Sequence, residues 1–189
     1  MKKALGAILL LAGIGLMLYP FLIERQQAKG TESLEQALAL IDTGEPANLD
    51  ELPVSQADLE GTFSLEIPSI GLEQYILPET TEENLNLALT QIKPGQVPGQ
   101  GNFTIAGHRG WRDGRHFSNL SEVAIGEQVM LHADGQTFVY EITESAVIPP
   151  TAVEVLDDQP DVDELTLITC TVSGKDRLAV KGKLVETES

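Results

Sequence analysis

The chain has 189 residues, of which 42% are hydrophobic and 5% aromatic, so we expect one domain with a core of Leu, Ile and Val. Its formal net charge of −17 argues against a nucleic-acid partner, because phosphate binding needs a basic surface. The single cysteine excludes an internal disulfide and a cysteine-rich zinc site.

The N-terminal region contains a long uncharged run. Residues 4–23 carry no charged side chain and would rise about 30 Å as a helix, which matches the hydrocarbon thickness of a bilayer. Lys2 and Lys3 precede the run, so residues 1–3 are predicted to stay in the cytoplasm. A cleaved signal peptide is the alternative, but no A-x-A-like cleavage site occurs before residue 30. We therefore predict an uncleaved, single-pass anchor in the plasma membrane.

Residues 24–60 are predicted to form an extracytoplasmic stalk. Leu34, Leu38 and Ile41 have helical spacing, and the polar stretch after them contains Gly and Pro, as is typical of a linker. The folded domain is then expected at residues 61–189, outside the membrane.

The pattern changes to β-strands from residue 61, where apolar and polar residues alternate. A capping box at residues 80–83 predicts a short helix that reaches Leu89, and a helical turn is expected at residues 115–120. Strands are predicted at residues 61–68, 70–77, 102–108, 126–133, 136–148, 164–171 and 177–186. Asp134-Gly135 between two of them is a strong hairpin signal. Many short strands indicate a mainly antiparallel sandwich or barrel.

Cys170 is the candidate nucleophile. It ends an apolar strand just before a turn, and basic residues follow it closely, which favours the reactive thiolate. The alternative is a buried, inert cysteine, since free Cys is among the most buried residue types. An idle thiol outside the cytoplasm would however be exposed to oxidation, which favours the catalytic interpretation.

A thiol nucleophile needs a proton partner, usually His. His108 also sits at a strand end, after Gly107, whereas His116 and His132 lie in other local contexts and are predicted to be dispensable. Strand alternation supports the choice, because His108 and Cys170 both fall opposite the more apolar face of their strands. Ile168 shares the face of Cys170, so this alternation is imperfect.

Arg177 follows Cys170 by seven residues, so a turn between them would bring its guanidinium to the same groove. There it could stabilise an oxyanion or orient a peptide carbonyl. A solvated surface Arg is an equal alternative from the residues alone.

Positive charge is concentrated in two groups. Outside residues 1–30 the chain holds 8 basic and 28 acidic residues. Arg109, Arg112 and Arg115 form the first group, and Lys175, Arg177, Lys181 and Lys183 form the second; only Lys93 stands by itself. Two basic groups on an acidic body suggest one local anion site, with solubilising surface residues as the alternative.

At this point the sequence resembles the sortases of Gram-positive bacteria, over residues 61–186 and the anchor. The carrying motifs are TLITC at 166–170 with Arg177 after it, and NFTIAGHR at 102–109. The resemblance implies an eight-stranded sortase β-barrel with short helices. It also implies cleavage of an LPxTG-like sorting signal between Thr and Gly and transfer of the surface protein to an amine of a lipid-linked peptidoglycan precursor.

The same resemblance implies roles for individual residues. Cys170 would form the thioacyl enzyme, His108 would exchange protons, and Arg177 would assist binding and the oxyanion. Thr169, Ala106 and Ile168 are assigned to substrate binding. No cofactor is expected, and the carboxylate-free loop at residues 93–101 predicts no calcium site of the kind found in some class A sortases.

The motif context looks most similar to class D, with class A second. A hydrolytic cysteine peptidase using the same residues stays open as an alternative, as does a non-catalytic cell-surface binding module. A metalloprotein is disfavoured because the histidines are scattered singly, without ligand spacing.

Overall fold

The structure is a computed structural model that describes residues 2–42, 59, 61–110 and 115–189; in residues 2–9, 20–28 and 40–42 it describes the backbone alone. The chain divides into two compact units, Met1–Leu52 and Pro53–Ser189. Most of the linker predicted after Ile41 lies outside the described residues.

The first unit contains one helix, α1 (Lys2–Asp42). The helical spacing predicted around Leu34 and Leu38 is therefore confirmed as helix, and it continues the N-terminal helix without a break. Leu34 and Leu38 are buried. Among the residues that the structure describes, no helix has the length and apolar character needed to cross a membrane. The span predicted at residues 4–23 stays a prediction.

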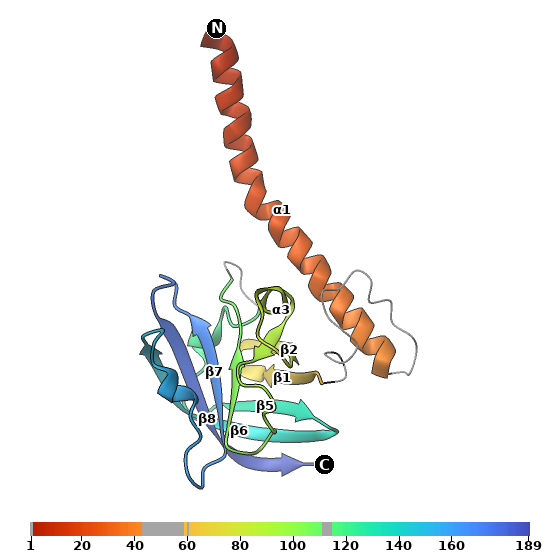
Figure 1. Ribbon diagram of the computed structural model, residues 1–189, viewed down its shortest axis with the longest axis vertical. Coiled ribbons are helices and arrows are strands. Elements are labelled where there is room, and N and C mark those ends of the chain that lie inside the picture. Colours follow the sequence, from red (N-terminus) through yellow and green to blue (C-terminus); the bar gives the residue numbers. More distant parts are fainter. Residues whose placement is uncertain (1, 43–58, 60, 111–114) are drawn as a thin grey trace. The chain divides into compact units, whose positions relative to one another are not determined.

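The second unit is a closed barrel of eight strands (Figure 1), which confirms the expected architecture. The strands are β1 (Phe63–Ile67), β2 (Leu72–Leu77), β3 (Leu89–Gln91), β4 (Asn102–Ala106), β5 (Gln128–Ala133), β6 (Gln136–Ile148), β7 (Glu164–Cys170) and β8 (Arg177–Glu188). Around the barrel they follow the order β1-β2-β3-β4-β7-β8-β6-β5. All seven predicted strands are present, and β3 is an eighth that was not predicted.

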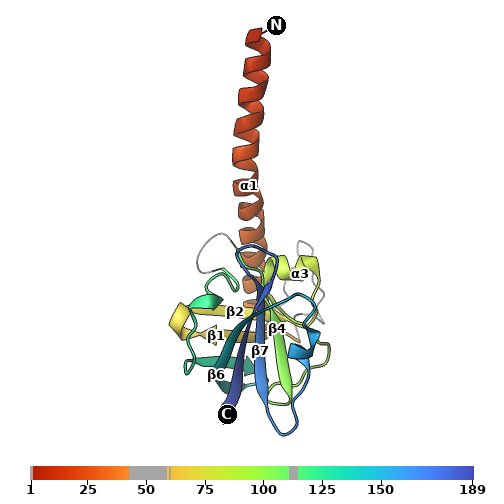
Figure 2. The same cartoon turned by 90° about the vertical axis from the view of Figure 1, so that its left-hand side faces the viewer.

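Two of the strand pairs are parallel, β2 with β3 and β4 with β7, and the others are antiparallel. Figure 2 shows β4 and β7 side by side on one wall of the barrel. The predicted hairpin joins β5 to β6, where Asp134 (φ 52°) and Gly135 (φ 75°) both adopt the left-handed backbone that a tight two-residue turn requires.

In the second unit the helices between the strands are short. They are α3 (Glu82–Leu87) and the 3-10 turns η1 (Pro68–Ile70), η2 (Leu120–Glu122) and η3 (Val153–Leu156). The cap lies one residue later than predicted, because Thr81 rather than Thr80 is the N-cap: Thr81 Oγ1 accepts a hydrogen bond of 3.0 Å from the Asn84 N–H. The predicted end at Leu89 is wrong: the extended backbone of Ala88 stops the helix and Leu89 begins β3. The helical turn expected at residues 115–120 forms later, as η2.

The barrel interior holds the core that strand alternation predicted. Inward residues of the three neighbouring strands β4, β7 and β8 are fully or almost fully buried in one cluster: Phe103, Ile105, Leu165, Leu167, Leu178 and Val180. Burial of such side chains is the main stabilising contribution to a small barrel. The same alternation sends Ala106, Ile168 and Cys170 to the outer face.

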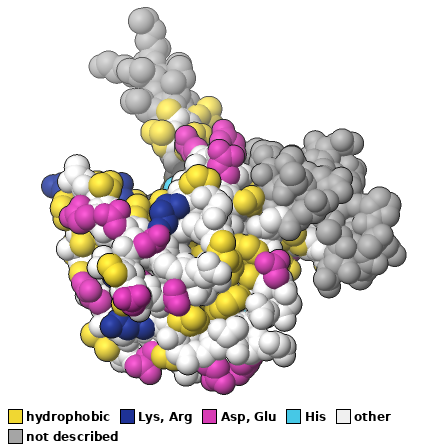
Figure 3. Space-filling view, turned by 60° about the horizontal axis from the view of Figure 1, so that its bottom comes forward, with side chains coloured by type: hydrophobic (Ala, Val, Ile, Leu, Met, Phe, Trp, Pro, Cys, Tyr) yellow, Lys and Arg dark blue, Asp and Glu magenta, His cyan; other side chains and the backbone are white. Residues whose placement is uncertain are grey.

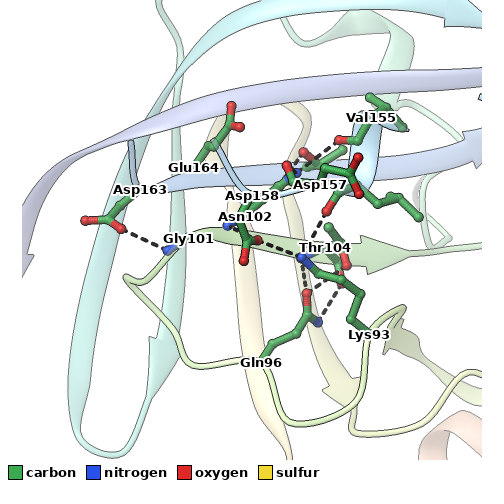
Figure 4. Close-up of polar contacts among 12 residues, drawn as sticks. Lys93, Gln96, Gly101, Asn102, Thr104, Val155, Asp157, Asp158, Asp163 and Glu164 are labelled. Carbon is green, nitrogen blue, oxygen red and sulfur yellow. Dashed lines mark hydrogen bonds and ion pairs between the residues drawn. The ribbon is translucent and has the colours of Figure 1, made fainter. Parts of the chain in front are cut away.

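The outer face of β4 and β7 is partly covered by a polar network (Figure 4). The Asn102 side chain donates to the carbonyls of Val155 and Asp157, at 3.0 and 3.2 Å. Lys93 Nζ lies 2.9 Å from both Leu156 O and Asp158 Oδ1, so this lysine is paired rather than isolated. Because these contacts cover the first part of the two strands, the face near Ala106 and Ile168 is left as the more accessible end.

Candidate active site

Cys170 and Arg177 are direct partners in the β7–β8 ladder, as the predicted turn between them requires. The turn closes through a 3.0 Å hydrogen bond from Thr171 N–H to Asp176 O. The Cys170 thiol is free and half-buried. Arg177 Nη1 donates to the carbonyls of Gly174 and Asp176 at 3.4 and 3.3 Å, so the structure places this guanidinium against the turn. Its Nε and Nη2 take no part in these two bonds.

His108 is brought to the same end of the barrel by the parallel pairing of β4 with β7. Ala106 is opposite Ile168, and His108 and Cys170 each follow two residues later. The pairing continues past the strand, because Gly107 N–H donates to Ile168 O at 3.1 Å. Side chains two residues apart on a strand share a face, so Cys170 lies on the outer side with Ile168, and the same spacing from Ala106 would direct His108 to that side.

Gly107, directly before His108, lies where the packing is tight. A Cβ at this position would lie 2.6 Å from Leu89 Cδ2 and 2.6 Å from Phe117 Cδ2. Any larger residue here would require Leu89, Phe117 or the backbone before His108 to shift. The Gly-His pair in the sequence is therefore explained by the approach of β3 and the segment that carries Phe117.

The environment of His108 favours its neutral form. Burial lowers the pKa of its imidazole below the usual value, and the positive charge of Arg115 lowers it further, while Glu82 acts in the opposite direction. A neutral imidazole can accept a proton from a thiol or an attacking amine, and its conjugate acid can donate one to a leaving amine.

A shallow cavity of about 310 Å³ lies beside Cys170. It is lined by Arg109, Gly110, Cys170, Thr171, Val172, Ser173 and Gly174. The floor therefore comes from the β7–β8 turn, and one side comes from the residues that follow His108. Larger cavities of about 580 and 450 Å³ are formed by other segments, mainly residues 91–102.

The basic groups are only partly directed at this cavity. Arg109 lines it and also contacts Ser121 Oγ at 3.4 Å. Arg115 instead donates to Asn86 O at 2.9 Å, and Lys181 pairs with Glu164 at 3.2 Å. Acidic side chains are spread over the barrel face seen in Figure 3, where Lys and Arg occupy few places. Arg112 lies outside the described residues.

The three residues assigned to substrate binding are placed differently from one another. Ala106 and Ile168 are half-buried on the outer face. Thr169 is only 2% exposed and its side chain falls on the inner face of β7, so its assignment to substrate binding stays a prediction. In the described part of the chain its Oγ1 has no hydrogen-bond partner.

Sequence reasoning missed the environment of His116. This residue is 3% exposed, and its Nδ1 lies 2.9 Å from Gln74 Oε1 of β2. Gln74 is polar at a strand position, and nothing in its sequence context pairs it with a distant histidine. Among the described residues no three His, Cys, Asp or Glu side chains gather as a metal site would require, and the absence of a calcium site stays a prediction.

Comparisons with known proteins agree with this geometry. A family model described as a sortase domain matches residues 65–185. Sortase A of Bacillus anthracis is 34% identical over 152 residues, which cover 79% of this chain and 70% of that protein. The solved structure of Listeria monocytogenes sortase A is 29% identical, covers 67% of this chain and 88% of its own, and gives a TM-score of 0.63.

A Clostridium perfringens Sortase D5 transpeptidase is 27% identical, with a TM-score of 0.62 over 87% of this chain and 99% of that chain. Similarity therefore extends to both class A and class D proteins and does not decide between them. The family model covers more than half of the chain and includes both strand ends that carry His108 and Cys170, so this chain belongs to the sortase family.

Proposed function

We propose that the chain is a cysteine transpeptidase that cleaves an LPxTG-like sorting signal between Thr and Gly and transfers the protein to an amine of a lipid-linked peptidoglycan precursor. The observation that carries the proposal is the strand register. Cys170 is directly opposite Arg177, and the parallel β4–β7 pair brings His108 to the same strand end.

In the first half-reaction the neutral His108 takes the proton of the Cys170 thiol, and the resulting thiolate attacks the carbonyl carbon of the substrate threonine. The S–C bond forms, the Thr–Gly C–N bond breaks, and the leaving glycine amine takes a proton from the protonated His108. In the second half-reaction an acceptor amine attacks the thioester and gives its proton to His108. The new amide forms, the S–C bond breaks, and the Cys170 thiolate is released.

Arg177 is proposed to stabilise the oxyanion of both tetrahedral intermediates. A guanidinium has five N–H donors, and the bonds to the two turn carbonyls use only Nη1. Those bonds are long, at 3.3–3.4 Å, so a substrate carbonyl could compete for the guanidinium. Ala106 and Ile168 would contact the sorting peptide from the outer face of β4 and β7.

The location proposed for the enzyme is the outer side of the plasma membrane, with residues 4–23 as the anchor. Along α1 several large apolar side chains are exposed: Leu10, Leu11, Ile14, Leu16, Met17, Leu18 and Tyr19. An exposed apolar surface of this kind is typical of a membrane or protein contact. We assign the enzyme to class D ahead of class A, on the loop that follows His108.

The test is incubation of the full chain, in detergent micelles, with LPxTG-type peptides, followed by mass spectrometry. A peptide that carries an electrophile in place of the scissile bond is expected to add to Cys170. Added amine should appear in the product; a free carboxylate as the only product would identify a hydrolytic peptidase. An unreactive Cys170 and no turnover would leave a binding module and overturn the proposal.

A further inference from the structure

The backbone of His108 is paired with a neighbouring segment that has no part in the proposed chemistry. Phe117 N–H donates to His108 O at 3.1 Å, and Arg109 forms an antiparallel bridge with His116. The position of His108 therefore depends on how residues 115–117 are held.

His116 anchors this segment from inside the protein. It is 3% exposed and has a left-handed backbone (φ 46°), which is rare for a residue other than glycine and costs free energy. Its Nε2 accepts a 3.3 Å hydrogen bond from Arg115 Nε–H, so the ring proton is assigned to Nδ1, which donates to Gln74 Oε1 at 2.9 Å. Burial and the Arg115 charge lower the pKa of His116 to about 4, so the imidazole stays neutral.

Arg115 is in turn fixed on a second side. Its Nη2 donates to Asn86 O at 2.9 Å, near the end of α3. The guanidinium is thus held between an α3 carbonyl and the His116 ring, and the charge held there is the one that lowers the pKa of His108. A strained backbone and a buried polar ring are expected to persist where they serve a site, because an apolar residue would fill the space at lower cost.

We propose that His116 is a positioning residue of the active site, which holds the Arg115 guanidinium and the backbone bridge to Arg109 so that His108 keeps its place and its neutral form. The charged and titratable groups that act on His108 are Arg115, Glu82 and the ring of His116. Arg109 follows it in the chain, and Cys170 and Arg177 lie at the end of β7 and the start of β8. His116 itself meets Gln74, Arg115 and His108. This inference rests on the proposed function, because it assigns His116 a place in that reaction.

The experiment uses the full chain in detergent micelles and compares three variants. His116→Leu removes both hydrogen bonds, His116→Gln keeps one donor and one acceptor, and His132→Gln is a matched control on β5. The measurements are kcat and KM against pH with an LPxTG-type peptide, the alkylation rate of Cys170 against pH, and the thermal unfolding midpoint. Should His116→Leu fail to fold, Gln74→Met removes the hydrogen bond between Gln74 and His116 from the β2 side.

His116→Leu is expected to lower kcat/KM about 10-fold, mainly through kcat, since a small displacement of a catalytic group is costly. The limb of the pH profile that follows His108 should move to higher pH, because an unfixed Arg115 opposes protonation of His108 less. His116→Gln should restore most of the activity and the profile, and His132→Gln should change neither.

An unchanged pH profile in His116→Leu and Gln74→Met, with only a lower unfolding midpoint, would show a purely structural residue and overturn the inference. If the wild-type chain does not turn over the peptide, the proposed function fails, but the role of His116 can still be tested. The pH dependence of Cys170 alkylation then reports the His108 environment without substrate, and it must differ between wild type and His116→Leu.

Discussion

Gly107→Ala is the sharpest test of how the site is positioned. The new Cβ would lie 2.6 Å from both Leu89 Cδ2 and Phe117 Cδ2, whereas carbon atoms in contact are normally about 3.5–4.0 Å apart. Relief therefore requires a displacement of about 1 Å, by the two side chains or by the backbone that carries His108. Overpacking of this kind costs about 1–3 kcal/mol of stability, and a 1 Å misplacement of a catalytic group can cost about 100-fold in rate.

The assay is kcat/KM for an LPxTG-type peptide together with the free energy of unfolding in denaturant. Gly182→Ala in β8 is the control, because its Cβ would also be tight, at 3.1 Å from Glu141 O, but next to a different part of the barrel. We expect both variants to lose stability and only Gly107→Ala to lose activity about 100-fold. A Gly107→Ala enzyme with wild-type kcat/KM would show that Leu89 and Phe117 give way without moving His108, and the reasoning would be wrong.

Three further predictions concern Cys170, Arg177 and the ion pair between Lys93 and Asp158. Cys170→Ala is expected to abolish turnover with an unchanged unfolding midpoint. Loss of one oxyanion donor leaves roughly 1% of the wild-type rate, so residual turnover above that level would contradict a nucleophilic role. Arg177→Lys keeps the charge but loses the planar fork, so kcat should fall more than KM rises in steady-state kinetics. Lys93 holds the pKa of Asp158 below its usual value, so the stability from this pair is present near neutral pH and is lost as the pH falls through the folded-state pKa. Thermal melts between pH 7 and 3 should show this loss in wild type and a flatter dependence in Asp158→Asn.

Strand alternation predicted more of this molecule than any other signal. It set His108 and Cys170 opposite the more apolar face of their strands; in the structure that apolar face, with Phe103 and Leu167, lies in the buried core. Period-two alternation is a property of one strand, so it can be read without knowing the partners. The β5–β6 hairpin was equally readable, because its turn chemistry is local.

The errors arise where a distant partner decides the structure. The run from Leu87 to Leu89 continues a helical pattern, but Thr90 pairs with Ala106, and this tertiary contact turns the chain into β3. Lys93 stands apart from the other basic residues, as the sequence indicated, but its acidic partner Asp158 lies across two loops and could not be predicted. The dispensability of His116 stays a prediction; what the sequence could not show is its partner, Gln74, on another strand.

Thr169 is next to Cys170 in the motif, and its assignment to substrate binding stays a prediction. Adjacent residues of a strand face opposite sides, so the same alternation that supports Cys170 removes the Thr169 side chain from the groove.

The parallel pairing of β4 and β7 also determines when an active thiol can exist. Parallel strands cannot be joined by a tight turn, and here β5, β6 and the loop after them intervene between the two partners. Contacts between distant parts of a chain form slowly, because the loop must close before the contacts stabilise it. As a chain is made from its N-terminus, the His108 side of the site is therefore present well before its partner. The proposed nucleophile meets this partner only when the last two strands close the barrel, so a chain that stops before β7 carries His108 without the thiol.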